Sequence, residues 1–207
     1  MLLTATGLGK RFQRDWIFQG LTRTFRPGSA TAVLGPNGAG KSTLLNTLSG
    51  QLLPTQGELT YELAGRAVPV EDVPQHLAYA APYLELLEEL TLLELLQFHT
   101  SFKPLRPGIT PDKLIDVMYL ENARQQLVRE FSSGMKQRLK LGLALYAAAP
   151  LLLLDEPTTN LDATGVAWYQ EHVQATRAGR TLLLSSNVPA EYAFCDEQLL
   201  VTDFQKR

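Results

Sequence analysis

The sequence has few of the residues that stabilise a chain without a large core or that bind a metal directly. Its 207 residues include one cysteine, Cys195, and three histidines. A single cysteine cannot form an internal disulfide, and this set is too sparse for a structural zinc cage. The chain also lacks an excess of basic charge, because 19 Lys and Arg residues stand against 21 Asp and Glu residues. We therefore expect a reducing compartment and no nucleic-acid partner.

Long hydrophobic runs are missing as well. The longest uncharged run, residues 141–154, is interrupted by Pro150, and it is shorter than the roughly 18–20 residues of a membrane-spanning helix. The N-terminus begins Met-Leu-Leu-Thr and reaches the basic residues Lys10 and Arg11 only later, which is unlike a signal peptide. These absences predict a soluble intracellular protein, for which any role at a membrane requires a partner.

The sequence does contain enough apolar residues, 45%, for a sizeable core. Three uninterrupted apolar runs cover residues 30–34, 151–154 and 181–185, and such runs are typical of strands buried on both faces of a parallel sheet. Helices are predicted after the first two runs, over residues 41–49 and 163–177. This alternation of strand, loop and helix indicates an α/β fold.

The remaining segments add two further regions to the α/β prediction. Short strand-like pieces occupy residues 2–34 and 51–80, where proline and glycine repeatedly interrupt them. From Tyr83 onward the character becomes helical, and predicted helix starts follow Thr91, Thr110 and Ser132. Thr91 and Glu94 make a capping box, and Pro111 occupies the first helical position after Thr110. We therefore expect a helical subdomain inserted between the two halves of the sheet.

The loop after the first apolar run carries the strongest chemical signal. Residues 35–42 read Gly-Pro-Asn-Gly-Ala-Gly-Lys-Ser and satisfy the phosphate-loop pattern between a strand and a helix. Glycines let the backbone approach a phosphate closely, and the amides that open the next helix point at the anion. Lys41 supplies a charge for the β- and γ-phosphates, and Ser42 supplies a hydroxyl for Mg²⁺. The loop predicts a nucleotide site.

The second apolar run ends in acidic residues that complete this prediction. Leu154 is followed by Asp155 and Glu156, so a carboxylate is expected at the carboxyl edge of the sheet, where phosphate-loop proteins hold Mg²⁺. Glu156 is the candidate for polarising the attacking water. Acidic residues often end strands, and the pair gains its meaning from the phosphate loop.

A third segment resembles the signature of the ATP-binding cassette (ABC) ATPases. Residues 131–138, Phe-Ser-Ser-Gly-Met-Lys-Gln-Arg, are similar to the family's Leu-Ser-Gly-Gly-Gln motif with its following basic residue, Gln and Arg. Residues 35–43 have the ABC form of the phosphate loop, and residues 155–162, Asp-Glu-Pro-Thr-Thr-Asn-Leu-Asp, look like the family's acidic strand end and D-loop. Phe12 falls where these proteins place an aromatic ring against adenine. The resemblance covers nearly the whole chain.

The resemblance implies one ABC ATPase domain over residues 1–207. Its expected fold is a RecA-like P-loop NTPase core with an N-terminal antiparallel β subdomain and a helical subdomain over roughly residues 83–145. The resemblance assigns ATP and Mg²⁺ binding within one protomer to Phe12, Gly35, Pro36, Asn37, Gly38, Ala39, Gly40, Lys41, Ser42, Thr43 and Asp155. Ser42 and Asp155 are the implied metal ligands, and Glu156, Lys41 and Asn187 are the implied catalytic residues.

The resemblance also implies partners. Two such domains pair head to tail in this family, so Ser132, Ser133 and Gly134, with Asp162 of the D-loop, would act at the nucleotide held by the opposite protomer. The pair is a homodimer or includes a second ATPase subunit. A separate transmembrane permease would hold the chain on the cytoplasmic face of the cell membrane. The wording of the signature is most similar to small bacterial exporters, including the haem-exporter type.

Two positions depart from the family pattern. Alignment places Pro82 where the family's Q-loop glutamine stands, and it places Asn187 where a histidine usually contacts the γ-phosphate. Losing one side-chain ligand need not prevent Mg²⁺ binding, since that ion readily keeps several waters. Asn187 still offers a neutral amide donor. We expect a working but slow ATPase.

Two alternatives to a transport ATPase stay open at this point. One is a soluble ABC ATPase that serves no transporter, such as an iron–sulfur assembly or translation-associated member. The other is a nucleotide-sensing module with little hydrolysis. The intact Lys41, Ser42, Asp155 and Glu156 favour hydrolysis over sensing.

Overall fold

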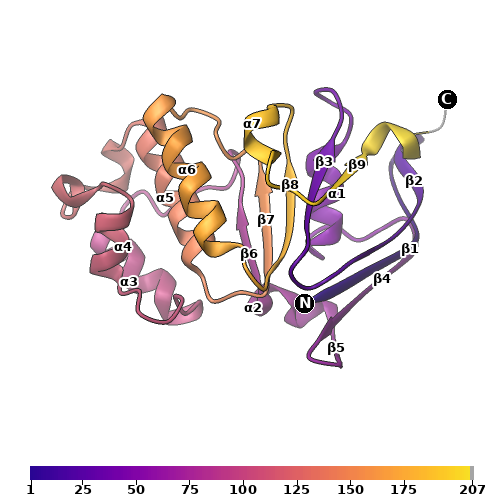
Figure 1. Cartoon of the computed structure of the whole chain (residues 1–207), viewed down its shortest axis with the longest axis horizontal. Helices are drawn as coiled ribbons and strands as arrows, with labels where there is room; N and C mark the ends of the chain where they lie inside the picture. Colours follow the sequence, from indigo (N-terminus) through magenta and orange to yellow (C-terminus); the bar gives the residue numbers. More distant parts are fainter. Residues whose placement is uncertain (206–207) are drawn as a thin grey trace. The chain divides into compact units, whose positions relative to one another are not determined.

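The three apolar runs predicted as buried strands are neighbours in one parallel sheet of the computed structural model, which describes residues 1–205 (Figure 1). These strands, together with β9, follow the order β7-β8-β3-β9. Their bounds are β3 (Ala30–Leu34), β7 (Leu151–Asp155), β8 (Thr181–Ser185) and β9 (Glu197–Leu200). Every residue of β7 and β8 is buried, which explains why their sequences are continuous apolar runs.

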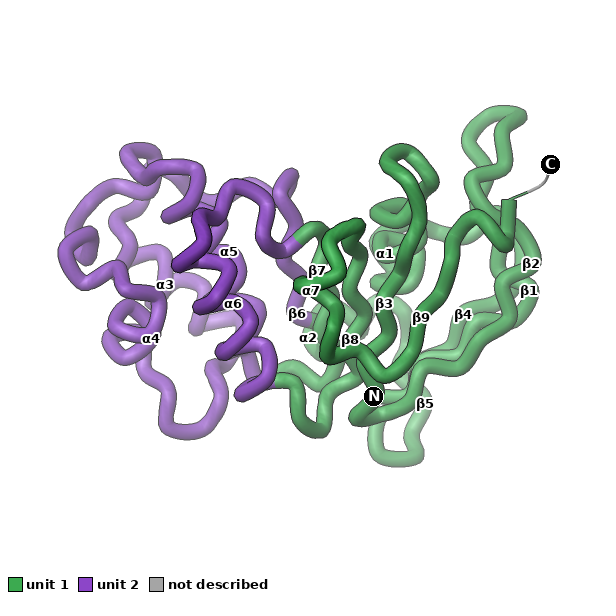
Figure 2. The backbone as a smooth tube through the Cα atoms, turned by 45° about the horizontal axis from the view of Figure 1, so that its top comes forward, with its two compact units in different colours: residues 1–77, 149–156, 177–207 green, residues 78–148, 157–176 purple. Residues whose placement is uncertain are grey.

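The chain forms two compact units, shown in different colours in Figure 2. Unit 1 comprises residues 1–77, residues 149–156 and the described residues from 177 onward. Unit 2 comprises residues 78–148 and 157–176. The helical subdomain expected over residues 83–145 lies inside unit 2, which also takes in the helix that follows the D-loop.

Unit 1 contains a second, antiparallel sheet of order β2-β1-β4-β5. Its strands are β1 (Leu2–Phe12), β2 (Asp15–Phe25), β4 (Gln56–Leu63) and β5 (Arg66–Val68). The pairing of β1 with β2 is irregular at three points, the first of them between Ala5 and Leu8. The helical elements of unit 1 are α1 (Lys41–Leu48), η1 (Val70–Asp72), α2 (Val73–His76), α7 (Pro189–Tyr192) and η4 (Val201–Phe204), where η denotes a 3₁₀ helix.

Unit 2 is mainly helical. Its elements are most of β6 (Leu77–Ala80), then α3 (Leu92–Phe102), α4 (Pro111–Val117), η2 (Glu121–Ala123), η3 (Val128–Glu130), α5 (Ser133–Tyr146) and α6 (Ala163–Thr176). The three predicted caps are confirmed, because the side chains of Thr91, Thr110 and Ser132 accept hydrogen bonds from the backbones that follow them. Residues 81–90 form an irregular loop, so the helical character that the sequence predicts from Tyr83 begins only after the first cap.

Within residues 1–205, no helix is both long enough and apolar enough to cross a bilayer.

Candidate nucleotide site

The phosphate loop, residues 35–43, joins β3 to α1 within unit 1. Gly38 and Gly40 have φ angles of +79° and +91°, a backbone region that favours glycine. Gly40 is also the N-cap of α1, and a Cβ atom there would collide with the side chain of Ile17 on β2. The glycines therefore let the loop close against β2 while its amides remain available at the start of a helix.

A cavity of about 230 Å³ opens beside this loop. It is lined by Asn37, Gly38, Gly40, Lys41, Ser42, Thr43 and Glu156. Lys41 is only 5% exposed, and its Nζ donates hydrogen bonds to the carbonyl oxygens of Gly35, at 2.9 Å, and Pro36, at 3.3 Å. A buried cation and the N-terminus of α1 thus share one cavity, and both favour an anion there.

Asp155 ends β7 opposite Ser185, its register partner on β8. The Ser185 hydroxyl donates a hydrogen bond to Oδ1 of Asp155. The second oxygen, Oδ2, is buried and has no hydrogen-bond partner within residues 1–205. A carboxylate that is 1% exposed with one oxygen unpartnered is costly to bury, so this oxygen is suited to receive a cation.

Glu156 lines the cavity from the residue immediately after β7. Its φ angle is +45°, a left-handed conformation that costs a non-glycine residue about 1–3 kcal/mol. The backbone amide of Glu156 donates to the carbonyl of Ser185 at 2.9 Å, and this bond helps to hold the strained turn. The strain directs a carboxylate into the cavity of the phosphate loop.

Asn187 and Phe12 lie differently with respect to this cavity. The Nδ2 atom of Asn187 donates to Oδ1 of Asn37 at 2.6 Å, so the residue aligned with the family histidine contacts the phosphate loop directly. Phe12, at the end of β1, is 47% exposed and does not line the cavity. The ammonium group of Lys10 lies 5.1 Å from its ring centroid. The ring is available at the surface.

Unit 2 gathers the signature and D-loop residues on a second cavity of about 360 Å³. Its lining includes Ser132, Ser133, Gly134 and Asp162. The hydroxyl of Ser132 accepts from the amide of Met135 at 3.2 Å. Asp162 accepts from the amide of Gly165 at 2.7 Å at the start of α6. These side chains therefore cap helices in addition to any role toward a ligand.

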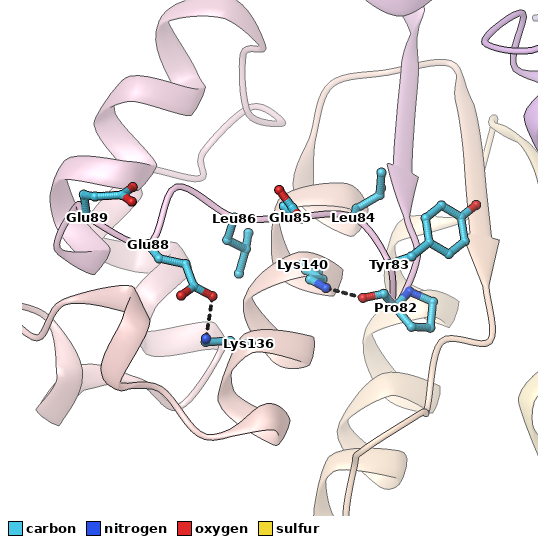
Figure 3. Close-up of a pocket in the computed structure, with 9 residues that line it drawn as sticks. All are labelled: Pro82, Tyr83, Leu84, Glu85, Leu86, Glu88, Glu89, Lys136 and Lys140. Carbon is cyan, nitrogen blue, oxygen red and sulfur yellow. Dashed lines mark hydrogen bonds and ion pairs between the residues drawn. The ribbon is translucent and has the colours of Figure 1, made fainter.

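Pro82 begins the irregular loop of unit 2 and is held through its backbone (Figure 3). Lys140 on α5 donates to the carbonyl of Pro82 at 2.6 Å, and Lys136, one turn earlier, pairs with Glu88 at 2.5 Å. Burial, together with the nearby Lys136, lowers the pKa of Lys140, and Glu88 partly opposes this effect. The proline ring has no polar atom, so this position supplies no side-chain ligand.

Sequence reasoning missed two polar residues that position others. Ser185 donates a hydrogen bond to Asp155. Its place in the sequence could have revealed this role, because it is a polar residue at the end of an apolar strand, at the same sheet edge as Asp155 and Glu156. Gln137 is 2% exposed and donates to the carbonyl of Pro157 at 2.7 Å. Its position within the signature segment was visible, but the carbonyl that it contacts could not be read from spacing.

Residues 18–159 match the family model described as ABC transporter. The cytochrome c biogenesis ATP-binding export protein CcmA of Xylella fastidiosa is 37% identical over 160 residues, which are 76% of this chain and 74% of that protein. A solved structure of the ATP-binding subunit of an ABC transporter is 27% identical and has a TM-score of 0.83, covering 97% of this chain and 85% of that one. A dimeric ATP-binding cassette in a post-hydrolysis state with ADP and phosphate is 18% identical, with a TM-score of 0.82 over 96% and 93% of the two chains.

Proposed function

The chain belongs to the ABC transporter family and has its ATPase fold, and from that premise we propose that it binds and hydrolyses ATP to power an exporter. The single observation that carries the proposal is the cavity that the phosphate loop shares with Glu156. Within it, a buried lysine, the start of a helix and a carboxylate face the same space. The likeness to a protein named for export supports the direction of transport.

The phosphate loop is the proposed binding site for the ATP phosphates. Lys41 exchanges the loop carbonyls that it now contacts for β- and γ-phosphate oxygens, and the amides at the start of α1 donate to the same group. Phe12 is proposed to stack on the adenine, because this residue is exposed at the end of β1. The remaining loop residues proposed to contact ATP are Gly35, Pro36, Asn37, Gly38, Ala39, Gly40, Ser42 and Thr43.

Mg²⁺ accompanies ATP in this family, and the residues present here fit that ion. Mg²⁺ prefers oxygen ligands and keeps several of its waters. The hydroxyl of Ser42 lines the cavity, and Asp155 carries a buried oxygen without a partner among the described residues. We propose that these two oxygens hold the ion, which supplies charge neutralisation at the phosphates when it is bound.

Glu156 is the proposed general base. The water that attacks the γ-phosphorus gives its proton to this carboxylate, the bond from the γ-phosphorus to the β-bridging oxygen breaks, and ADP and phosphate leave. The left-handed backbone at Glu156 supports this role, because strain of this kind concentrates at functional sites.

Two departures from the family set the proposed rate. Pro82 offers no polar side-chain atom for Mg²⁺ or water, and Asn187 already donates one of the two N–H groups of its amide to Asn37. A γ-phosphate would share that amide with Asn37. We therefore propose hydrolysis that is slower than with the family's usual glutamine and histidine, with nucleotide binding retained.

The signature cavity of unit 2 is the proposed half-site for a second protomer. Ser132, Ser133 and Gly134, together with Asp162, are gathered there, and a relative in fold is known as a dimer with ADP and phosphate. We propose a head-to-tail pair, either of this chain or with a second ATPase subunit. The pair acts on the cytoplasmic face of the membrane through a separate permease.

Steady-state phosphate release from the purified chain tests the proposal. Hydrolysis by the parent that is lost in Lys41→Ala supports an ATPase, whereas ATP binding without phosphate release would indicate a nucleotide-sensing module. Co-purification of a multi-spanning membrane protein from native membranes separates a transport ATPase from a soluble ABC ATPase.

A further inference from the structure

The segment after β9 lies beside the phosphate loop because of the pairing of two strands. β9 and β3 run parallel, and Leu200 is the register partner of Leu34. The residues that follow both strands therefore leave the sheet at the same edge. After β3 comes the phosphate loop, and after β9 come η4 and Gln205. We infer that Gln205 is a positioning residue of the phosphate loop, and this inference rests on the proposed function.

The inference depends on one hydrogen bond between Gln205 and the phosphate loop. The Nε2 atom of Gln205 donates to the backbone carbonyl of Ala39 at 3.1 Å. Ala39, the residue that carries the acceptor, is 5% exposed. The acceptor lies in the middle of the phosphate loop, one residue before the N-cap of α1.

Gln205 is itself exposed, and its backbone is anchored by the element that precedes it. η4 packs against β2, and Val201 within it is fully buried. The Cβ of Val201 also lies 3.9 Å from the position that a Cβ on Gly35 would take. The same strand, β2, presents Ile17 to Gly40. β2 and η4 thus pack against the phosphate loop near Gly40 and Gly35, and Gln205 follows η4 directly.

The carbonyl of Ala39 and the amide of Gly40 belong to one trans peptide group. Its carbonyl and its amide point in opposite directions in one rigid plane, and the described chain has no cis peptide bond. Holding the carbonyl of Ala39 therefore also fixes the direction of the amide of Gly40. Gly40 lines the cavity, and backbone amides at such a position are donors to phosphate oxygens. Gln205 orients that amide without touching the nucleotide.

The expected effect is moderate. Losing one neutral hydrogen bond that holds a donor in place should weaken binding by about 2- to 12-fold. The loss should fall on nucleotides whose phosphates occupy the loop, and so on ATP and ADP alike. Turnover at saturating ATP should not change, because Gln205 does not contact the reacting atoms.

The experiment compares dissociation constants for ATP and ADP in the purified full chain. Gln205→Ala should lower the affinities for ATP and ADP equally. Gln205→Glu should lower them further, because the glutamate places an acceptor against the carbonyl oxygen of Ala39. Gln205→Lys, which restores a donor, should recover most of the affinity. Gln198→Ala, an exposed glutamine on β9, is the matched control and should bind like the parent.

Melting temperatures measured without nucleotide separate positioning from stability. The inference requires that Gln205→Ala melts like the parent in the absence of ATP and shows a smaller ATP-induced rise. A lower melting temperature without ATP, with no change in either dissociation constant, would overturn it. Parent-like affinity in all three Gln205 variants would also overturn it while leaving the proposed function intact. A parent chain that binds neither ATP nor ADP would overturn both.

Discussion

The two units place their candidate functional residues on different kinds of structure. In unit 1, the phosphate loop, Asp155 and Glu156 lie at the carboxyl ends of parallel strands, and left-handed backbone occurs at glycines of the loop and at Glu156. In unit 2, Ser132 and Asp162 stand at the starts of α5 and α6, and their side chains already satisfy helix amides. Unit 1 therefore has a polar atom without a hydrogen-bond partner among the described residues, Oδ2 of Asp155. The candidate side chains of unit 2 already cap helices and would have a second role at a nucleotide under the proposed function.

This difference predicts that substitutions in unit 1 change chemistry or binding with little cost in stability. Substitutions in unit 2 should change stability and the action on a partner's nucleotide together.

The largest effect is expected from Glu156→Gln in unit 1. Removing a general base typically slows turnover by about 10²- to 10⁴-fold without removing ground-state binding. The variant should bind ATP, release phosphate very slowly and accumulate as a closed dimer. Phosphate release and size-exclusion chromatography with ATP measure both outcomes. Glu58→Gln, an exposed carboxylate on β4, is the control, and unchanged turnover in Glu156→Gln would remove the proposed base.

Lys41→Ala should have the next largest effect, on binding. Charge-assisted hydrogen bonds to phosphate are worth about 1.5–3 kcal/mol, which corresponds to about 10- to 150-fold in affinity. Nucleotide titration by calorimetry measures the loss. Lys113→Ala, an exposed lysine on α4, should bind like the parent. Parent-like affinity in Lys41→Ala would contradict the phosphate-loop assignment.

Ser132→Ala tests the double use of groups in unit 2. Loss of the cap should lower the free energy of unfolding by about 0.5–2 kcal/mol, measured by urea titration. Phosphate release should fall as well, while ATP affinity at dilute, monomeric protein stays unchanged. Ser101→Ala, at an exposed position on α3, is the control. A loss of turnover with no loss of stability would break the contrast between the units.

Acidification should act through unit 2. Burial is the first cause that lowers the pKa of both His99 and His172, with Lys103 adding to the effect at His99 and Glu171 opposing it at His172. The unfolded chain therefore binds more protons than the folded chain just below pH 6.5, so stability is full above that pH and falls as the pH decreases. Urea titrations between pH 7 and pH 5 should show this fall, and His172→Gln should reduce it. An equal slope in the variant would exclude His172 as a cause.

The smallest effect is expected from Asn187→His. The parent amide is engaged with Asn37, and a histidine would restore the family's usual donor to the γ-phosphate. Turnover should rise by a few-fold, well below the roughly 10²- to 10³-fold of a complete transition-state donor, with ATP affinity nearly unchanged. Pro82→Gln alone should do little, because the rest of the loop is shaped around the fixed φ angle of a proline. A fall in phosphate release in Asn187→His would indicate that other residues have taken over the contact.

Much of the fold could be predicted from local sequence. The three apolar strands, the helix after the phosphate loop and the caps at Thr91, Thr110 and Ser132 all agree with the structure. Buried parallel strands need continuous apolar runs, and caps need particular side chains, so both leave direct marks in a sequence. The short elements α7 and β9 left no such mark, because four residues are too few to show a period.

The sequence by itself determined which chemistry is present: a phosphate loop with Lys41, an acidic strand end, a signature segment, and departures from the family at Pro82 and Asn187. Only the tertiary structure decided which groups meet. The contacts of Asp155 with Ser185, Asn37 with Asn187 and Ala39 with Gln205 join residues 30, 150 and 166 positions apart. Such contacts depend on strand order and register, which bring together residues that share no local pattern.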